Sequence, residues 1–331
     1  MHPSSSQSPP VVATPGCRKR RFPNLYAFWT FARPHTIIGT SLSVFALYWI
    51  AIAELGTWQQ GIGLPLVQTF LPALIACLCG NVYIVGLNQL EDIEIDRINK
   101  PHLPIASGEF SRSLGRKIVA LMGGLTLILS AWSGVWLIAT VWLSLLIGTA
   151  YSLPPIRLKR FPVWAALCIF SVRGAIVNLG LFLHFNHHLQ NRGWGIAGYT
   201  TQFPPTVLAL TLFILIFTFA IAIFKDIPDM EGDRRYNIST FTLRLGTAAV
   251  FNLARWVLTV CYLGMILVAP FLPGINPPFL VITHLLALAS LWWYSQKTDL
   301  KDRQAIARCY QFIWKLFFLE YLIVPIACLL N

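Results

Sequence analysis

The sequence predicts an all-α membrane protein with nine transmembrane helices in two related halves. Composition is the first observation: 56% of the 331 residues are hydrophobic, 11% are charged and mean hydropathy is +0.63, more apolar surface than one soluble core needs. The second is a repeat, because D-x-E-x-D-R occurs at Asp92–Arg97 and again, 137 residues later, at Asp229–Arg234. The third is the clustering of basic residues in alternate loops, which supports the number of spans.

The first 21 residues are expected to form a disordered basic tail, followed by one transmembrane domain over 22–331. Residues 1–17 are rich in Ser and Pro, and the run Arg-Lys-Arg-Arg follows at 18–21. A secretory signal is not expected, because the next stretch is aromatic and amphipathic and does not form a short apolar run with a small-residue cleavage site. This stretch, 22–33, predicts a helix at the membrane interface.

Nine apolar segments then follow, each long enough to cross a hydrocarbon layer of about 30 Å. The boundary between the third and fourth segments depends only on Ser133-Gly134. The predicted spans are 36–53, 66–88, 117–134, 136–153, 162–183, 204–224, 248–270, 277–294 and 310–329.

The basic residues predict the orientation. With the N-terminus on the cytoplasmic side, 21 of the 25 Lys and Arg residues fall in or beside cytoplasmic segments, as the positive-inside rule requires. Both acidic clusters, which follow the second and sixth spans, then face the cytoplasm or an equivalent stromal side. The basic segments are 18–33, 97–117, 157–160, 225–244 and 297–308.

Composition also argues against two kinds of binding protein. The net charge of +12 does not indicate a nucleic-acid partner, because no soluble domain with a basic face is visible. The seven cysteines lie mostly in apolar runs without zinc-ligand spacing, so they are read as small buried hydrophobic residues.

The first acidic cluster follows the second span. If the helix continues, Asn88, Asp92 and Asp96 recur at i, i+4 and i+8 and share one helix face. Three stacked oxygen-bearing side chains form a surface suited to a hard cation. Glu94 falls on the far side of an ideal helix and is therefore ranked below them.

The second acidic cluster follows the sixth span. Asp226, Asp229 and Asp233 recur at i, i+3 and i+7, again on one face. Pro228 either breaks the incoming helix or starts a new one, which leaves the register of Asp226 open.

Carboxylates from two helices suit Mg²⁺, which prefers about six oxygen ligands and keeps some of its waters. Neither cluster contains His or Cys, which argues against zinc or copper. A solvated acidic loop paired with lysines is the alternative, but it gives no reason for the repeat or for the one-sided spacing.

A basic stretch on the same predicted membrane side, Tyr151–Arg160, offers partners for phosphate oxygens. Tyr151 and Lys159 are candidates for binding phosphate, and Arg97 and Lys225 add two cations beside the clusters. Ordinary positive-inside residues are the competing interpretation, which we prefer for Arg160 alone.

Several charged residues lie inside or at the edge of predicted spans. Arg33 and His35 open the first span, where either could meet a carboxylated substrate, although Arg33 could equally reach lipid head groups. Arg173 lies within a span and must therefore face protein, a cavity or a partner. Lys315 and Glu320 of the last span could pair, although five residues is poor helical spacing.

The two clusters resemble the paired aspartate-rich motifs of the UbiA superfamily of intramembrane prenyltransferases. Longer sequence segments around and beyond these motifs resemble the homogentisate phytyltransferases of cyanobacteria and plastids. The similarity extends from about Tyr26 to the C-terminus. The segments that carry this resemblance are 81–90, 96–101, 151–160, 223–233 and 310–321.

The resemblance implies a nine-helix bundle around a central cavity in which Mg²⁺ bridges both motifs to a prenyl diphosphate. Asp92, Asp96, Asp229 and Asp233 would carry catalysis as metal ligands, joined by Asn88 and Asp226. The diphosphate would be held by Arg97, Tyr151, Lys159 and Lys225. From their place near the cytoplasmic mouth we hypothesise separately that Arg33 or His35 recognises the carboxylate or a ring hydroxyl of the acceptor.

The implied reaction transfers phytyl from phytyl diphosphate to homogentisate, with loss of CO₂ and pyrophosphate, on the route to tocopherol. The partners would be these two substrates and the lipid bilayer of a cyanobacterial thylakoid or plasma membrane. A geranylgeranyl or solanesyl donor and a 4-hydroxybenzoate or naphthoate acceptor stay open, as does the oligomeric state. A cation transporter is the non-enzyme alternative, but it would place its carboxylates near the bilayer midplane.

Overall fold

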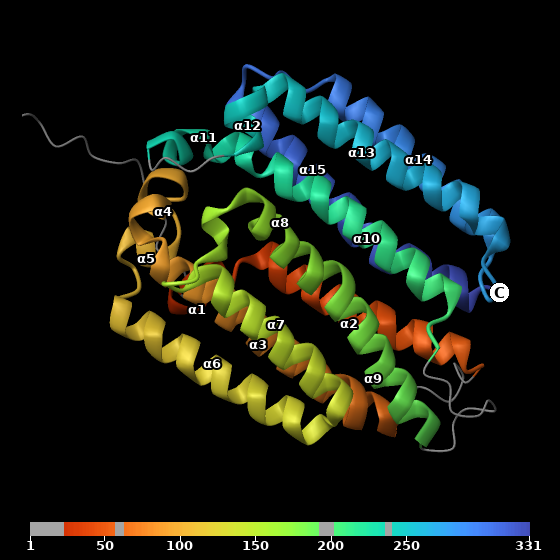
Figure 1. Ribbon diagram of the computed structural model, residues 1–331. Helices are drawn as coiled ribbons and strands as arrows, with labels where there is room; N and C mark the ends of the chain where they lie inside the picture. The colour runs from red at the N-terminus through yellow and green to blue at the C-terminus, as the bar shows by residue number, and fades with distance from the viewer. Residues whose placement is uncertain (1–22, 57–62, 192–201, 236–239) are drawn as a thin grey trace, which may run out of the picture.

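The computed structural model describes residues 23–56, 63–191, 202–235 and 240–331, in which the regular elements are all helices (Figure 1). Nine spans in this part of the chain are long and apolar enough to cross a membrane. Their number and order confirm the prediction. They are formed by α2 (Pro34–Glu54), α3 (Leu71–Glu91), α6 (Arg112–Ser133), α7 (Val135–Ser152), α8 with α9 (Pro162–Phe170 and Val177–Asn191), α10 (Pro205–Phe224), α13 (Thr247–Val268), α14 (Pro277–Gln296) and α15 (Arg303–Leu329).

In the described part of the chain, six short helices connect or precede the spans. Figure 1 shows α4, α5, α11 and α12 together at one end of the bundle, with the C-terminus at the other. The two acidic clusters therefore lie at the same end, as predicted. The short helices are α1 (Pro23–Phe31), α4 (Ile93–Asn99), α5 (Pro104–Ser107), η2 (Leu158–Arg160), α11 (Asp226–Arg235) and α12 (Phe241–Leu245).

Apolar side chains both fill the bundle and cover its outside. Tyr48 and Tyr262 are buried in the interior, whereas Trp132 is 88% exposed and Phe271 81% exposed. Large apolar residues that face outward at this frequency indicate a surface in contact with lipid.

Glycines allow the helices α3 and α6 to pack closely. A Cβ atom at Gly86 would lie 2.6 Å from Phe31 and 2.8 Å from Val119, and one at Gly123 would lie 2.8 Å from the ring of Tyr83. Small residues at such contacts are how helices approach each other in membranes, where the hydrophobic effect adds little between them.

The predicted boundary between the third and fourth spans is confirmed. Gly134 connects α6 to α7 with φ of 106°, a left-handed conformation that residues with a Cβ rarely adopt. A single residue therefore reverses the chain between the two helices.

Two sequence-based expectations about helix continuity need correction. The helix α3 does not run through the first cluster, because it ends at Glu91, and Asp92 has φ of −111° and ψ of 20° before α4 begins. The fifth span contains a π-helical turn, η3 (Ser171–Ile176), between α8 and α9.

Lys315 and Glu320 of the last span, whose helical spacing is poor for a pair, do not contact each other. Glu320 forms an ion pair with His284 of α14, with Nε2 and Oε2 3.3 Å apart, and both side chains are fully buried. Lys315 is exposed on the other side of α15. The relation between the two halves stays a prediction, and the tail at 1–21 lies outside the described residues.

Candidate active site

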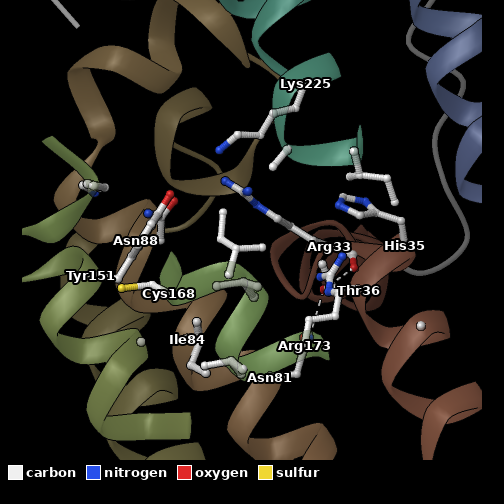
Figure 2. Close-up of a pocket in the computed structure, with 18 of the residues that line it drawn as sticks. Arg33, His35, Thr36, Asn81, Ile84, Asn88, Tyr151, Cys168, Arg173 and Lys225 are labelled. Atoms are coloured by element: carbon white, nitrogen blue, oxygen red, sulfur yellow. Dashed lines mark hydrogen bonds between the residues drawn. The ribbon is translucent and has the colours of Figure 1, made fainter. Parts of the chain in front are cut away.

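A cavity of about 1030 Å³ opens among the helices below the short helical segments. Its walls come from α2, α3, α7, α10, α15 and the π-helical turn η3. Figure 2 shows Asn88 and Tyr151 on one side of this cavity, and Arg33, His35, Thr36 and Arg173 gathered on the other.

The first acidic motif lines the cavity across the break between α3 and α4. The backbone N–H of Asp92 donates to the carbonyl of Asn88 at 3.0 Å, and that of Asp96 donates to the carbonyl of Asp92 at 2.7 Å. One helical i to i+4 bond therefore closes α3 and another opens α4 on either side of the break, and all three side chains reach the cavity wall. The predicted single face is preserved although the helix is interrupted.

The second motif lies on its own helix, α11, which packs against α4. Lys225, between α10 and α11, lines the cavity together with Asp226. Pro228 is the third residue of α11, so it belongs to a newly started helix and resolves the open register. Asp229 and Asp233 follow Asp226 by about one and two helical turns. Their side chains lie outside the described part of the structure.

Two cations hold the carboxylate of Asp92. Lys159 Nζ lies 2.7 Å from Oδ2, and Arg157 Nη2 lies 3.0 Å from Oδ1. The side chains are 11%, 21% and 14% exposed for Lys159, Arg157 and Asp92, so water screens these contacts little. Burial lowers the pKa of Lys159 despite the opposing effect of Asp92.

Arg157 is a site residue that sequence reasoning passed over. The only available signal was its place two residues before Lys159 in the basic stretch. Its contact with Asp92 spans 65 positions of the chain, and its backbone φ of 39° is unusual for a residue with a Cβ.

Arg97, predicted to bind the diphosphate, is not among the residues that line the cavity. Arg97 binds Glu94 at 2.9 Å, and their side chains are 57% and 59% exposed. Five residues after Asp92, Arg97 points away from the face of α4 that carries Asp96.

The two predicted acceptor residues both line the cavity. Arg33 Nη2 lies 3.9 Å from Oδ2 of Asp96, and the ring of His35 lies 5.0 Å from that of Trp314. Thr36 accepts a hydrogen bond of 3.0 Å from the amide of Asn81 on α3. A polar patch therefore joins the start of α2 to the middle of α3.

The donor set at the cavity mouth fits a hard cation. Asn88, Asp92, Asp96 and Asp226 offer oxygen atoms alone, as Mg²⁺ prefers. Among the side chains that the structure describes, no three His, Cys, Asp or Glu residues meet at metal-ligand spacing, and Asp229 and Asp233 fall outside that search.

Comparison with known proteins identifies relatives of this chain. Residues 27–316 match the model of the UbiA prenyltransferase family. The homogentisate phytyltransferase of Synechocystis is 52% identical over 92% of this chain and 96% of its own. The chloroplastic homogentisate phytyltransferase 1 of Arabidopsis thaliana is 40% identical over 91% of this chain and 75% of its own.

Solved structures agree on the fold. The structure of a UbiA homolog from Archaeoglobus fulgidus bound to GPP and Mg²⁺ superposes with a TM-score of 0.59 at 16% identity, covering 90% of this chain and 99% of that one. The family match, the relatives and the nine spans confirm the resemblance seen in the motifs. The chain therefore belongs to the UbiA prenyltransferase family, the multi-pass membrane enzymes that transfer prenyl groups.

Proposed function

We propose that this protein is a homogentisate phytyltransferase. The C1–O bond of phytyl diphosphate breaks and pyrophosphate leaves, while a bond forms from C1 to a ring carbon of homogentisate, which loses its proton. The acetate side chain loses CO₂ and takes up a proton, which makes it a methyl group. The product, 2-methyl-6-phytylbenzoquinol, leads to tocopherol. The observation that carries the proposal is the 52% identity to the Synechocystis enzyme of that name over almost the full length of both chains.

In this proposal the cavity mouth holds the diphosphate. Lys159, Arg157 and Lys225 donate charged hydrogen bonds to its oxygens, with Tyr151 on the same wall. Bound Mg²⁺ would neutralise the charge that develops on the departing pyrophosphate. Its ligands, directly or through water, would be Asn88, Asp92, Asp96, Asp226, Asp229 and Asp233.

Deeper in the cavity the walls protect the allylic carbocation. Ile84, Trp314 and Phe317 line this part, and apolar and aromatic side chains exclude water that would otherwise capture the cation. Aromatic ring faces also stabilise positive charge. The long apolar tail of the donor needs such an environment along its whole length.

Arg33 or His35 would orient homogentisate from the cavity mouth. Both side chains line the cavity. In the orientation that the basic residues predict, the site would open to the cytoplasm from a cyanobacterial thylakoid or plasma membrane. Alanine at either position should raise the KM for homogentisate. An unchanged KM in Arg33→Ala and His35→Ala would remove this assignment.

The test uses membranes that contain the protein, Mg²⁺ and homogentisate labelled either in the ring or at the carboxyl carbon. Phytyl, geranylgeranyl and solanesyl diphosphates are compared side by side, because relatives named for the last two donors are 35% and 39% identical. We expect ring label in the quinol, carboxyl label in CO₂, and the highest kcat/KM with phytyl diphosphate. A product that retains the carboxyl label, or no product, would contradict the proposal.

A further inference from the structure

Arg173 is a charged residue placed inside the membrane by an irregular stretch of helix. It lies in the π-helical turn η3, within the fifth span, and lines the cavity. The turn packs against α10, where a Cβ at Gly174 would lie 2.5 Å from Leu215, so glycine permits the close approach. π-Helical turns inside α-helices often mark functional sites because they redirect side chains.

The guanidinium of Arg173 rests on aromatic rings. It lies 4.9 Å from the centroid of Trp314 and 5.8 Å from that of Phe317. Among the side chains that the structure describes, no carboxylate forms an ion pair with it. Arg33, by contrast, faces Asp96.

An arginine inside a membrane span is unfavourable unless it faces a polar cavity or a partner of opposite charge. The cations Arg157 and Lys159 lie at the mouth beside Asp92, where the proposed function places the diphosphate. The guanidinium of Arg173 lies at the cavity wall against the rings of Trp314 and Phe317, and no described carboxylate pairs with it. Its position therefore suits an anion that enters the cavity.

The surroundings of Arg173 fit a flat acid better than a diphosphate. Trp314 also contacts His35, and the neighbouring Thr36 binds Asn81. Asn81 precedes Asn88 by seven residues on α3, which is about 10 Å deeper along the helix axis. This wall offers a ring to stack on and hydrogen-bonding groups beside one guanidinium, away from the aspartates.

We propose that Arg173 binds the carboxylate of the aromatic acceptor and makes the enzyme select an aromatic acid over the same ring without the acid. The inference rests on the proposed function. A guanidinium matches a carboxylate with two parallel hydrogen bonds, and the low dielectric of the cavity strengthens them.

The experiment compares two acceptors in Arg173→Gln, Arg173→Lys and the wild type. Homogentisate carries the carboxylate, and methylhydroquinone is the same ring with a methyl group in place of the acetate. In Arg173→Gln the KM for homogentisate should rise about 10- to 100-fold, as expected for a lost charged hydrogen bond. The KM for the donor should stay within twofold, and methylhydroquinone, as substrate or competitive inhibitor, should bind as in the wild type.

Arg255→Gln is the matched control. Arg255 also stacks on a tryptophan, 4.4 Å from the centroid of Trp292, but it does not line the cavity. Arg173→Lys keeps the charge and should recover part of the affinity for homogentisate. If a variant shows no turnover, equilibrium dialysis of purified protein with labelled homogentisate and labelled donor separates the two affinities.

Two results would overturn the assignment while the proposed function stands: equal KM values for homogentisate in Arg173→Gln and Arg255→Gln, or a rise in the KM for the donor alone. Loss of donor binding in dialysis would also overturn it. A wild-type protein that prenylates no homogentisate would instead refute the proposed function itself.

Discussion

Replacing Lys159 by methionine tests the charge arrangement at the cavity mouth. The change keeps the length of the side chain and removes the ammonium group that lies 2.7 Å from Asp92. In the proposed function this ammonium group donates a charged hydrogen bond to the diphosphate. Such a bond contributes about 1.5–3 kcal/mol, and 1.4 kcal/mol corresponds to a factor of ten in kcat/KM. We therefore expect kcat/KM for the prenyl diphosphate to fall about 10- to 100-fold in Lys159→Met.

In the double variant Lys159→Met/Arg157→Met, the loss of transition-state stabilisation, calculated from kcat/KM for the prenyl diphosphate, should exceed the sum of the losses in the two single variants. Either cation alone leaves Asp92 one cationic side chain, whereas removing both leaves bound Mg²⁺ as the remaining counter-charge of this largely buried carboxylate, so the two effects are coupled. The assay is the initial rate of prenyl transfer against donor concentration at saturating Mg²⁺ and acceptor. Lys315→Met, an exposed lysine of α15, is the control. Equal kcat/KM in Lys159→Met and Lys315→Met would refute the reasoning.

Three further predictions concern the metal and the bundle. Asp92→Ala and Asp229→Ala should each abolish turnover at saturating Mg²⁺ while the protein still inserts and purifies, and near-wild-type activity in either would contradict the two-motif site. EDTA should stop prenyl transfer and added Mg²⁺ should restore it, so turnover that persists in EDTA would exclude metal dependence. Glu320→Ala should lower the denaturation midpoint in detergent by roughly 4 °C, because His284 loses its buried partner at about 3 kcal/mol. Exposed Glu109→Ala should not change the midpoint, and equal midpoints in both variants would contradict the role of the pair.

The sequence predicts the spans well because each is an apolar run bounded by charge, proline or glycine, and these signals are local. Gly134 marks the boundary between α6 and α7 for the same reason. The common end of the two acidic clusters follows from counting basic loops, which needs no tertiary information. The confirmed part of the fold could therefore be predicted from local composition and charge without knowledge of the tertiary contacts.

Tertiary pairing explains what sequence patterns missed. Arg157 meets Asp92 across 65 residues, and Glu320 meets His284 on a neighbouring helix, so neither pair leaves a local spacing to find. Arg97 is adjacent to Asp96 in the sequence, but it faces outward and pairs with Glu94. Consecutive residues of a helix point in different directions, so the neighbour of a site residue need not face the site. The break at Asp92 carries no proline or glycine signal either.

The interruptions at Asp92 and Lys225 separate two tasks along the polypeptide. The acidic groups sit on α4 and α11, which cap the bundle, while the compartment for a prenyl tail is bounded by the long helices below. Substitutions within the spans can reshape that compartment without displacing the capping pair. This separation is consistent with the relatives of this chain, which are 35–52% identical to it and are named for transfer of phytyl, geranylgeranyl and solanesyl groups.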